Sequence, residues 1–332
     1  MTGRIAINGF GRIGRGVLRA ILEQGLDLEV VAINDLTDGT KLVQLFNFDS
    51  VYGRAAQRAS LEGDELVIGE RRIKLLAQPD PSKLPWRELQ VEAVLEATGR
   101  FAEAAKARVH LDAGAKRVLV SAPSSGADAT LVKGVNWNSY DPNQHFVISN
   151  GSCTTNALAP LAKVLNDLAG IKQGFMTTVH AYTQDQNLVD APHSDPRRAR
   201  AAGLNIVPTS TGAAKAIGKV LPELEGKLSG DAIRVPVPVG SIVEINAFLS
   251  REVSADELLA AYRAASEGEL AGVLEFSEDP LVSSDIVGDP ASSIFDSGLV
   301  RVAGRHVKVS SWYDNEWGFS NRAAETLAML TA

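Results

Sequence analysis

The sequence contains one cysteine, Cys153, among its 332 residues. A single thiol excludes an intrachain disulfide and any zinc or iron–sulfur centre held by several thiolates. No apolar run reaches the ~18 residues that suggest a membrane-spanning helix. The N-terminus, "MTGRIAINGF", lacks the basic and apolar segments of a secretion signal. We therefore expect a cytoplasmic protein with no membrane association.

The sequence also lacks an excess of positive charge. Its 33 Lys and Arg residues against 40 Asp and Glu give a net charge of −7. This balance argues against a broad surface for nucleic acid, and we predict no nucleic-acid partner, although a local basic pocket remains compatible with it. Internal repeats and low-complexity segments are absent, and the length favours two domains.

The first segment of the chain has the pattern of a dinucleotide-binding turn. The apolar strand "RIAIN" leads directly into "GFGRIG", in which Gly9, Gly11 and Gly14 have the GxGxxG spacing. A helical pattern follows, and a second strand, "LEVVAIN", ends at Asp35, 21 positions after Gly14. The glycines permit a tight turn, close approach of a pyrophosphate and close packing of helix on strand, while Asp35 would accept hydrogen bonds from a ribose. The GxGxxG spacing alone is weak evidence for nucleotide binding. The strand before it, the helix after it and the acidic residue beyond favour dinucleotide binding over a plain turn.

The same alternation continues to about residue 150. The strand "VEAVLEA" ends before Thr98 and Gly99, a helix is predicted over 101–113, and "KRVLVSAP" is a strand ending at Ser121. Ligands of open α/β sheets bind at the carboxyl ends of strands, so Thr98, Gly99 and Ser121 are candidate contacts on the nicotinamide side. They could equally be ordinary loop residues. We predict a Rossmann-type parallel sheet in residues 1–150.

The second half has a different pattern. A helix is predicted from about 155 to 168, with Pro160 making its first turns irregular. Long alternating strands such as "SIVEINAFLS" and the hairpin "LVRVAGRHVKVSSW" follow with few helices between them. This predicts an α+β domain with a mainly antiparallel sheet over 151–315. An amphipathic helix at 316–332 would complete the first domain.

Cys153 and His180 are the candidate catalytic pair. A helix starting at Cys153 and the following strand, "GFMTTVH", are each ~20 Å long, so the strand should return His180 to the cysteine. A helix N-terminus and an imidazole both favour the nucleophilic thiolate, and His180 could also move protons. Considered separately, Cys153 would be interpreted as an inert buried cysteine and His180 as a hydrogen-bonded histidine without a catalytic role. Together, next to a dinucleotide fold, they favour a covalent mechanism.

Basic and hydroxyl residues in the second half suggest anion binding. Arg234 lies in the apolar strand "AIRVPVPV", where a guanidinium needs an anionic partner. Arg198 belongs to the densest basic run, for which a solvated face is the usual explanation. The segment "PTSTG" could open a helix that binds an anion. One or two phosphate groups are predicted at Thr183, Arg198, Thr211, Gly212 and Arg234.

These motifs occur in an order that resembles the phosphorylating glyceraldehyde-3-phosphate dehydrogenase family over essentially the whole chain. The most specific are "SNGSCTTN" and "TTVHAYT", accompanied by "INGFGRIGR", "PTSTGAAKA", "RVPVP" and "SWYDNEWGFSNR". The resemblance implies oxidation of glyceraldehyde 3-phosphate with inorganic phosphate and NAD, through a thioester on Cys153 with His180 as the base. It also implies a homotetramer, with the loop around 180–203 at subunit contacts.

The resemblance assigns further residues. It implies cofactor contacts by Arg12, Ile13, Asp35, Ser121 and Asn315. It implies substrate and phosphate contacts by Ser152, Thr154, Thr183, Arg198, Thr211, Gly212 and Arg234. We expect no metal site, because the spacing of the remaining histidines matches none.

Three departures from the family pattern leave alternatives open. Gly151 and Ala157 replace residues of the familiar "SNASCTTNC", and Pro79 replaces an adenine-side arginine. Ala191 replaces the leucine of "DLPH", which is compatible with NADP, whereas Asp35 would repel a 2′-phosphate and favours NAD. The rivals are an NADP-preferring member, erythrose-4-phosphate dehydrogenase, and a catalytically idle nucleotide-binding or interaction protein. The phosphate loop "PTSTG" and the intact Cys153 and His180 oppose the last two.

Overall fold

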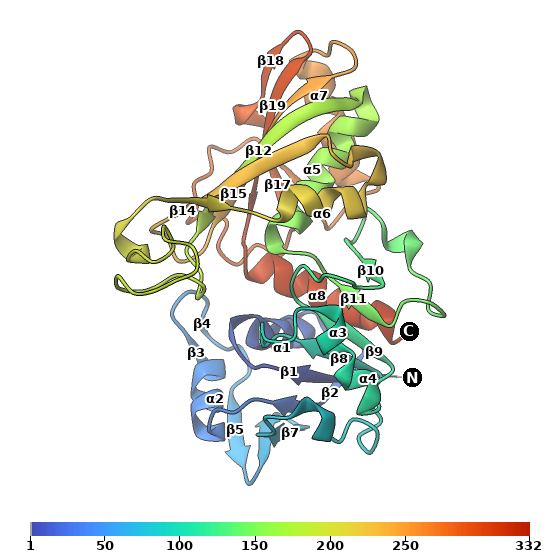
Figure 1. The fold of residues 1–332 in the computed structure, drawn as a ribbon, viewed down its shortest axis with the longest axis vertical. Coiled ribbons are helices and arrows are strands. Elements are labelled where there is room, and N and C mark those ends of the chain that lie inside the picture. Colours follow the sequence, from blue (N-terminus) through green and yellow to red (C-terminus); the bar gives the residue numbers. More distant parts are fainter. Residues whose placement is uncertain (1) are drawn as a thin grey trace. The chain divides into compact units, whose positions relative to one another are not determined.

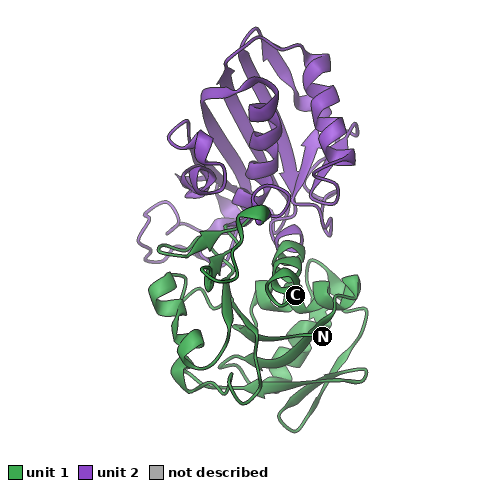
Figure 2. Ribbon diagram, turned by 90° about the vertical axis from the view of Figure 1, so that its right-hand side faces the viewer, with its two compact units in different colours: residues 1–131, 138–151, 320–332 green, residues 132–137, 152–319 purple. Residues whose placement is uncertain are grey.

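The computed structural model describes residues 2–332 and divides into two compact units (Figures 1 and 2). The first unit contains the chain up to Leu131, Asn138–Gly151 and Ser320–Ala332. The second contains Val132–Trp137 and Ser152–Phe319. Relative to the predicted limits, the segments 132–137 and 316–319 group with the second unit and Gly151 groups with the first, so that the division falls within the C-terminal helix α8 (Trp317–Leu330).

The first unit is built on a sheet of nine strands among the described residues, in the order β10-β11-β9-β8-β1-β2-β7-β6-β5. All neighbours from β10 to β7 are parallel, and β6 and β5 extend the edge antiparallel. This confirms the predicted Rossmann-type sheet. The strands are β1 (Gly3–Asn8), β2 (Leu28–Asn34), β5 (Ala59–Glu62), β6 (Glu65–Ile68), β7 (Arg71–Leu76), β8 (Ala93–Glu96), β9 (Arg117–Val120), β10 (Ala129–Thr130) and β11 (Val147–Ser149).

The helices of this unit connect the strands. They are α1 (Arg12–Gln24), α2 (Gly39–Asn47), α3 (Ala104–Ala107) and α4 (Val109–Asp112), and a small ribbon of β3 (Phe48–Asp49) and β4 (Gly53–Arg54) follows α2. The helix predicted over 101–113 is thus shorter and divided at Arg108. There the N–H of Leu111 bonds to the carbonyl only three residues back, at 2.9 Å, which tightens the turn.

The second unit has a mixed sheet in the order β13-β14-β12-β15-β19-β17-β16, with β18 paired to β19. Most of its pairs are antiparallel, as predicted, and the pairs of β12 with β14 and of β16 with β17 are parallel. The strands are β12 (Ile171–Ala181), β13 (Val207–Ser210), β14 (Leu228–Val235), β15 (Ser241–Leu249), β16 (Leu274–Ser277), β17 (Ser293–Asp296), β18 (Arg301–Ala303) and β19 (His306–Tyr313). The helices are α5 (Cys153–Ala169), α6 (Ala213–Val220) and α7 (Ala255–Glu267).

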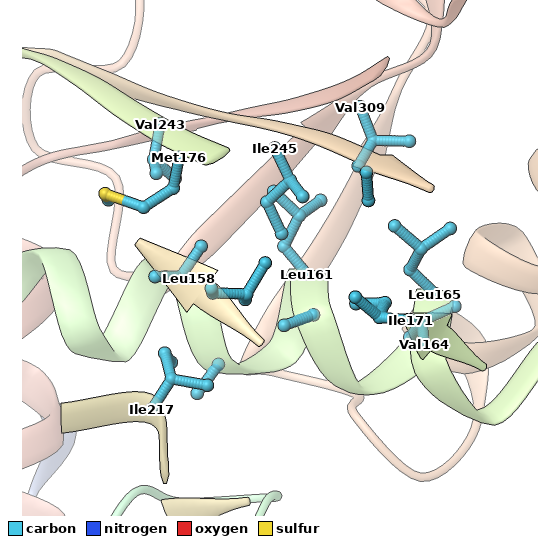
Figure 3. Packing of buried hydrophobic residues seen from close by; sticks show 14 of the residues in the cluster. Leu158, Leu161, Val164, Leu165, Ile171, Met176, Ile217, Val243, Ile245 and Val309 are labelled. Atoms are coloured by element: carbon cyan, nitrogen blue, oxygen red, sulfur yellow. The ribbon is translucent and has the colours of Figure 1, made fainter. Parts of the chain in front are cut away.

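The core of the second unit forms where α5 packs on this sheet (Figure 3). Leu158, Leu161 and Leu165 repeat at helical spacing along α5 and are fully buried. They face apolar side chains of the central strands, including Val243, Ile245 and Val309 (Figure 3). Helix α5 is continuous through Pro160, so the predicted irregularity of its first turns does not interrupt the helix. This packing fixes the direction of the helix that begins at Cys153.

Candidate active site

Cys153 is the first residue of the 17-residue helix α5. Ser152 caps this helix, because its Oγ accepts a hydrogen bond from the backbone N–H of Thr155 at 3.0 Å. The thiol therefore lies at the positive end of the helix dipole, which favours negative charge on sulfur. The cap also shows that Ser152, predicted as a substrate contact, has a structural role.

His180 lies near the end of β12 and meets Cys153. The distance between Cys153 Sγ and His180 Nε2 is 3.3 Å, so the strand returns to the cysteine as the sequence predicted. Strand β12 is held on both sides, by β14 and β15, which places the histidine on a rigid element. The two side chains form a thiol–imidazole pair within hydrogen-bonding distance.

The other ring nitrogen of His180 has two competing neighbours. Its Nδ1 lies 2.7 Å from the carbonyl oxygen of Ala181 and 2.9 Å from Arg234 Nη1. If Nδ1 donates its proton to Ala181, the Nε2 lone pair faces the thiol and can act as a base. If Nδ1 instead accepts from Arg234, the proton moves to Nε2. The position of Arg234 thus bears directly on the tautomer of His180.

The charge balance of the pair is set by burial and by Arg234. Burial, followed by the charge of Arg234, lowers the pKa of His180 to about 3. Burial raises the pKa of the Cys153 thiol, against the opposing effect of the Arg234 charge. The structure therefore places a thiol beside a neutral imidazole, whereas the sequence favoured the thiolate. The difference arises because the sequence does not reveal that the fold buries His180 almost completely and Cys153 in part.

Tyr313 supports the pair and was not identified from the sequence. Its hydroxyl lies 2.9 Å from Thr154 Oγ1 and 2.8 Å from Thr178 Oγ1, and its ring meets that of His180 edge-on, with 5.9 Å between centroids. Burial raises the pKa of Tyr313 well above its usual value. The predicted substrate residue Thr154 is therefore buried and tied to this tyrosine. Tyr313 belongs to the motif "SWYDNEWGFSNR". Its place as an aromatic residue at the end of an apolar strand was the only feature of the sequence that could have indicated a role in the site.

Arg234 is the centre of the predicted anion site. Its Nη1 donates to the Ala181 carbonyl at 3.1 Å and lies 3.4 Å from Thr183 Oγ1, while its buried Nε has no hydrogen-bond partner in the protein. Burial is the main cause that lowers the pKa of Arg234. A phosphate is the type of ligand that would satisfy such a guanidinium.

Arg198 has a different environment. Its guanidinium pairs with Asp185, and its Nε donates to Thr209 Oγ1 at 2.9 Å. A phosphate would therefore have to share Arg198 with a carboxylate. Thr211 and Gly212 immediately precede α6, and Gly212, its N-terminal cap, has open space beside its Cα. The N-terminus of this helix is accessible to an anion.

The glycine-rich turn of the first unit has the geometry that a dinucleotide requires. Gly9 has φ of +96°, and a Cβ there would lie 2.7 Å from the backbone nitrogen of Thr98. A Cβ on Gly14 would lie 2.2 Å from the carbonyl oxygen of Gly9, whereas Gly11 has open space and no side chain caps α1. The first and third glycines are thus needed for packing, and the second leaves room for a pyrophosphate at the helix N-terminus.

The other predicted cofactor residues are held at defined positions. Asp35 follows β2, and its carboxylate accepts from the backbone N–H groups of Phe10 (2.8 Å) and Thr37 (2.9 Å). Arg12, at the start of α1, pairs with Asp49 at 2.6 Å, and Ile13 beside it is half-buried. The carboxylate of Asp35 is therefore fixed beside the turn. Its remaining lone pairs suit a ribose hydroxyl.

The remaining candidates lie at strand ends of the two units. In the first unit, Thr98 and Gly99 follow β8, and Ser121 follows β9 with its hydroxyl bonded to the Glu96 carbonyl at 3.0 Å. In the second unit, Asn315 follows β19 and accepts from Gly240 N and Ser241 Oγ through its amide oxygen. This leaves its amide N–H groups available to a ligand.

The described residues contain neither a metal-binding cluster nor a membrane-spanning helix. Within residues 2–332, no cluster of three or more His, Cys, Asp or Glu side chains could hold a metal ion. Among the helices that the structure describes, none has the length and hydrophobicity of a membrane span.

A dinucleotide-type unit followed by a unit with a thiol–imidazole pair defines a nucleotide-dependent oxidoreductase that uses a cysteine. The family described as "Glyceraldehyde 3-phosphate dehydrogenase, NAD binding domain" matches residues 3–104, and its "C-terminal domain" matches 152–315. The chain belongs to the glyceraldehyde-3-phosphate dehydrogenase family.

Similar proteins cover almost the whole chain. A glyceraldehyde-3-phosphate dehydrogenase of Kitasatospora aureofaciens is 68% identical over 329 residues, which is 99% of both chains. The protein of that name from Mycobacterium tuberculosis (strain ATCC 25618 / H37Rv) is 58% identical over 336 residues, with 99% of both covered. Glyceraldehyde-3-phosphate dehydrogenase 1 of Streptomyces avermitilis is 56% identical over 330 residues, covering 99% of this chain and 98% of its own.

Proposed function

We propose that this protein oxidises and phosphorylates D-glyceraldehyde 3-phosphate to 1,3-bisphosphoglycerate with reduction of NAD. The carrying observation is the 3.3 Å contact between Cys153 Sγ and His180 Nε2 at the start of α5, in a chain that belongs to this family throughout. Cys153 is the nucleophile and His180 is the base. The overall reaction conserves the free energy of aldehyde oxidation in an acyl phosphate.

The first step is the attack of sulfur on the aldehyde carbon. His180 Nε2 accepts the thiol proton as the carbon–sulfur bond forms, and the proton then passes to the aldehyde oxygen, giving a hemithioacetal. In the tautomer that this step requires, Nδ1 donates a hydrogen bond to the Ala181 carbonyl, 2.7 Å away, and the lone pair is on Nε2. A thiol beside a neutral imidazole, the pair that the pKa shifts of Cys153 and His180 favour, is competent for this concerted transfer.

The oxidation step leaves a thioester. NAD, when bound, would supply the acceptor for the hydride of the hemithioacetal carbon. The role of His180 in this step is to take the hydroxyl proton. Inorganic phosphate then attacks the thioester carbon, and the Cys153 sulfur leaves. Because the thioester is covalent, oxidation and phosphate capture must use the same cysteine.

Two anion-binding sites would hold the two phosphate groups of this reaction, that of the substrate and inorganic phosphate. Arg234 and Thr183 hold one, and Thr211 and Gly212 at the start of α6 hold another, with Arg198 alongside. Ser152 and Thr154 contribute the backbone around the nucleophile. The partnerless Nε of Arg234 supports this assignment because a buried guanidinium without an anion is unfavourable.

NAD is the cofactor of the proposed reaction. Gly11, Arg12 and Ile13 bind its pyrophosphate at the start of α1, Gly9 and Gly14 allow the tight turn and close packing that open this site, and Asp35 binds the adenosine ribose. A carboxylate there repels the 2′-phosphate of NADP. On the nicotinamide side, the contacts are Thr98, Gly99, Ser121 and Asn315.

Steady-state assays of NADH formation test the proposal. Glyceraldehyde 3-phosphate with NAD and inorganic phosphate should give the highest kcat/KM. Parallel assays replace the substrate by erythrose 4-phosphate, the cofactor by NADP, or phosphate by a buffer without it. Faster turnover of erythrose 4-phosphate, or turnover that ignores phosphate, would contradict the proposed reaction.

A homotetramer in the cytoplasm completes the proposal. The segment after β12 exposes large apolar side chains, which solvent disfavours unless another subunit covers them. They are Leu188 (86% exposed), Val189 (68%), Leu204 (85%) and Ile206 (69%).

Sedimentation velocity of the parent protein should give the mass of a tetramer, and the double variant Leu188→Asp, Leu204→Asp should dissociate it. Val282→Asp, at an exposed apolar residue elsewhere, is the matched control, and a monomeric parent protein would contradict the proposal.

A further inference from the structure

A chain of buried polar side chains joins three strand ends in the first unit. Asn8, Asn34 and Glu96 are the last residues of β1, β2 and β8, and the registers place Asn8 opposite both of the others. Asn34 Nδ2 donates to Asn8 Oδ1 at 2.7 Å, and Asn8 Nδ2 donates to Glu96 Oε2 at 2.6 Å. Since all three are almost completely buried, each bond has a fixed direction and no competition from water.

His110 on α4 joins this chain with a defined tautomer. Trp86 Nε1 lies 3.1 Å from His110 Nδ1, and an indole N–H can only donate. His110 Nδ1 is therefore an acceptor, and the single proton of the ring is on Nε2. That proton is directed to Glu96 Oε2 at 3.0 Å. His110 is consequently a neutral donor to the carboxylate.

Glu96 receives four donors and faces no cation among its partners. Besides Asn8 and His110 on Oε2, its Oε1 accepts the backbone N–H of Thr98 at 2.8 Å and the Thr98 hydroxyl at 2.5 Å. The hydroxyl of Thr98 can donate here because it accepts from the N–H of Arg100 at 3.1 Å. A buried carboxylate is tolerated only when donors compensate for the lost water, and this set does so with neutral groups alone.

The residues that Glu96 holds are the candidate nicotinamide contacts. Its carboxylate fixes Thr98, next to Gly99 with φ of +73°, and its backbone carbonyl accepts both the N–H and the hydroxyl of Ser121, at 3.0 Å each. Glu96 thus holds Thr98 through its carboxylate and Ser121 through its backbone carbonyl, and Gly99 follows Thr98 directly.

We propose that Glu96 is a positioning residue for the nicotinamide half of the cofactor, with His110 and Trp86 fixing its orientation. This rests on the proposed function only in assigning Thr98, Gly99 and Ser121 to the nicotinamide side. Asp35 and the glycine-rich turn, which would hold the adenosine and pyrophosphate, make no direct hydrogen bond to the Glu96 carboxylate and are linked to it only through Asn8 and Asn34. Loss of the carboxylate should therefore weaken binding of the nicotinamide half much more than binding of the other half.

The variant Glu96→Gln tests this with binding measurements. Glutamine keeps the shape but replaces one acceptor oxygen by an NH2 group, so two of the four donors lose their acceptor. His110 cannot compensate by changing tautomer, because its Nδ1 must remain unprotonated to accept the hydrogen bond from Trp86 Nε1. Calorimetry should show the dissociation constant for NAD+ rising about tenfold or more, with that for ADP-ribose changed less than about twofold.

Glu92→Gln is the matched control, since Glu92 precedes the same strand at its opposite end and pairs with Lys116. It should bind both ligands as the parent protein does.

Equal weakening of the binding of NAD+ and ADP-ribose by Glu96→Gln, or no weakening of either, would overturn the proposal. If that variant does not fold, Thr98→Val removes the two hydroxyl bonds, to Glu96 and from the N–H of Arg100, and keeps the backbone bond to Glu96. It should raise the dissociation constant for NAD+ about threefold and leave that for ADP-ribose unchanged; equal effects on both constants would also overturn the proposal. Absence of dehydrogenase activity in a parent protein that binds NAD+ would contradict the proposed function and leave this inference intact.

Discussion

His180 in the second unit and His110 in the first are both buried, but their neighbours give them opposite properties. The Nδ1 of His110 is fixed as an acceptor by Trp86, and its Nε2 proton belongs to Glu96. The Nδ1 of His180 has both an acceptor, the Ala181 carbonyl, and a donor, Arg234, within 2.9 Å. His110 therefore has one proton arrangement, whereas His180 can adopt two.

Burial therefore has different consequences for the two histidines: it stabilises the structure at His110 and changes the acid–base properties of His180. His110 has complementary partners on both ring nitrogens and holds a loop in position. His180 faces a thiol with one nitrogen and a cation with the other, and burial with that cation lowers its pKa to about 3. A histidine with incompatible neighbours is costly for stability, and such sites are typical of catalysis.

The largest expected effect comes from removing the nucleophile of the His180 site. Cys153→Ser should lower kcat for NADH formation by at least about 10³-fold, because a hydroxyl is a far weaker nucleophile than a thiol. It should also abolish labelling by iodoacetamide, since Cys153 is the only cysteine. Binding of NAD+ measured by calorimetry should be unchanged. Turnover near that of the parent protein would contradict a covalent mechanism.

The imidazole itself gives the next largest effect. His180→Asn should lower kcat by about 10²- to 10⁴-fold, since proton transfer at the thiol and at the hemithioacetal loses its base. His306→Asn is the matched control, because His306 is exposed on β19 of the same sheet, and its kcat should stay near that of the parent. A similar loss in both variants would show that the sheet, rather than the base, is affected.

A smaller effect concerns stability at acid pH. Because the pKa of His180 is lowered to about 3 in the folded protein, folding opposes its protonation. The associated stability is fully present above the unfolded value of about 6.5 and is lost as pH falls toward 3. Between pH 7 and pH 5 the loss is on the order of 2 kcal/mol. Urea unfolding at both pH values should show a smaller pH effect in His180→Asn, and an identical pH effect would contradict the burial of a neutral His180.

Much of this molecule could be predicted from sequence because its signals are local. Strand, glycine turn and helix are adjacent in "RIAINGFGRIGR", and the approach of His180 to Cys153 follows from the lengths of one helix and one strand. The parallel and antiparallel sheets also follow from strand patterns.

What could not be predicted depends on contacts across distant segments. The pairing of Arg198 with Asp185 and the contact of Arg234 with His180 require the folded loop. Glu96 meets Asn8 across 88 positions, and its segment looked like any other apolar strand. One signal was present: "RIAIN", "LEVVAIN" and "VEAVLE" each place a polar residue at the end of a buried strand, and such residues in neighbouring parallel strands meet at one edge.

The smallest expected effect concerns the backbone before Cys153, where this chain has glycine and the family pattern has alanine. Gly151 has φ of +67°, in the left-handed region that other residues adopt only with strain. Gly151→Ala should therefore lower the free energy of unfolding by about 1 kcal/mol, measured by urea unfolding. Because neither Cys153 nor His180 depends on the missing side chain, kcat should change less than about twofold. Gly298→Ala, outside the left-handed region and with only an ordinary contact to Asp296 Oδ1 at 3.4 Å from the new Cβ, is the control and should leave stability nearly unchanged. An unchanged stability in Gly151→Ala would mean that the backbone relaxes to accept alanine, so that glycine at this position gives no conformational advantage.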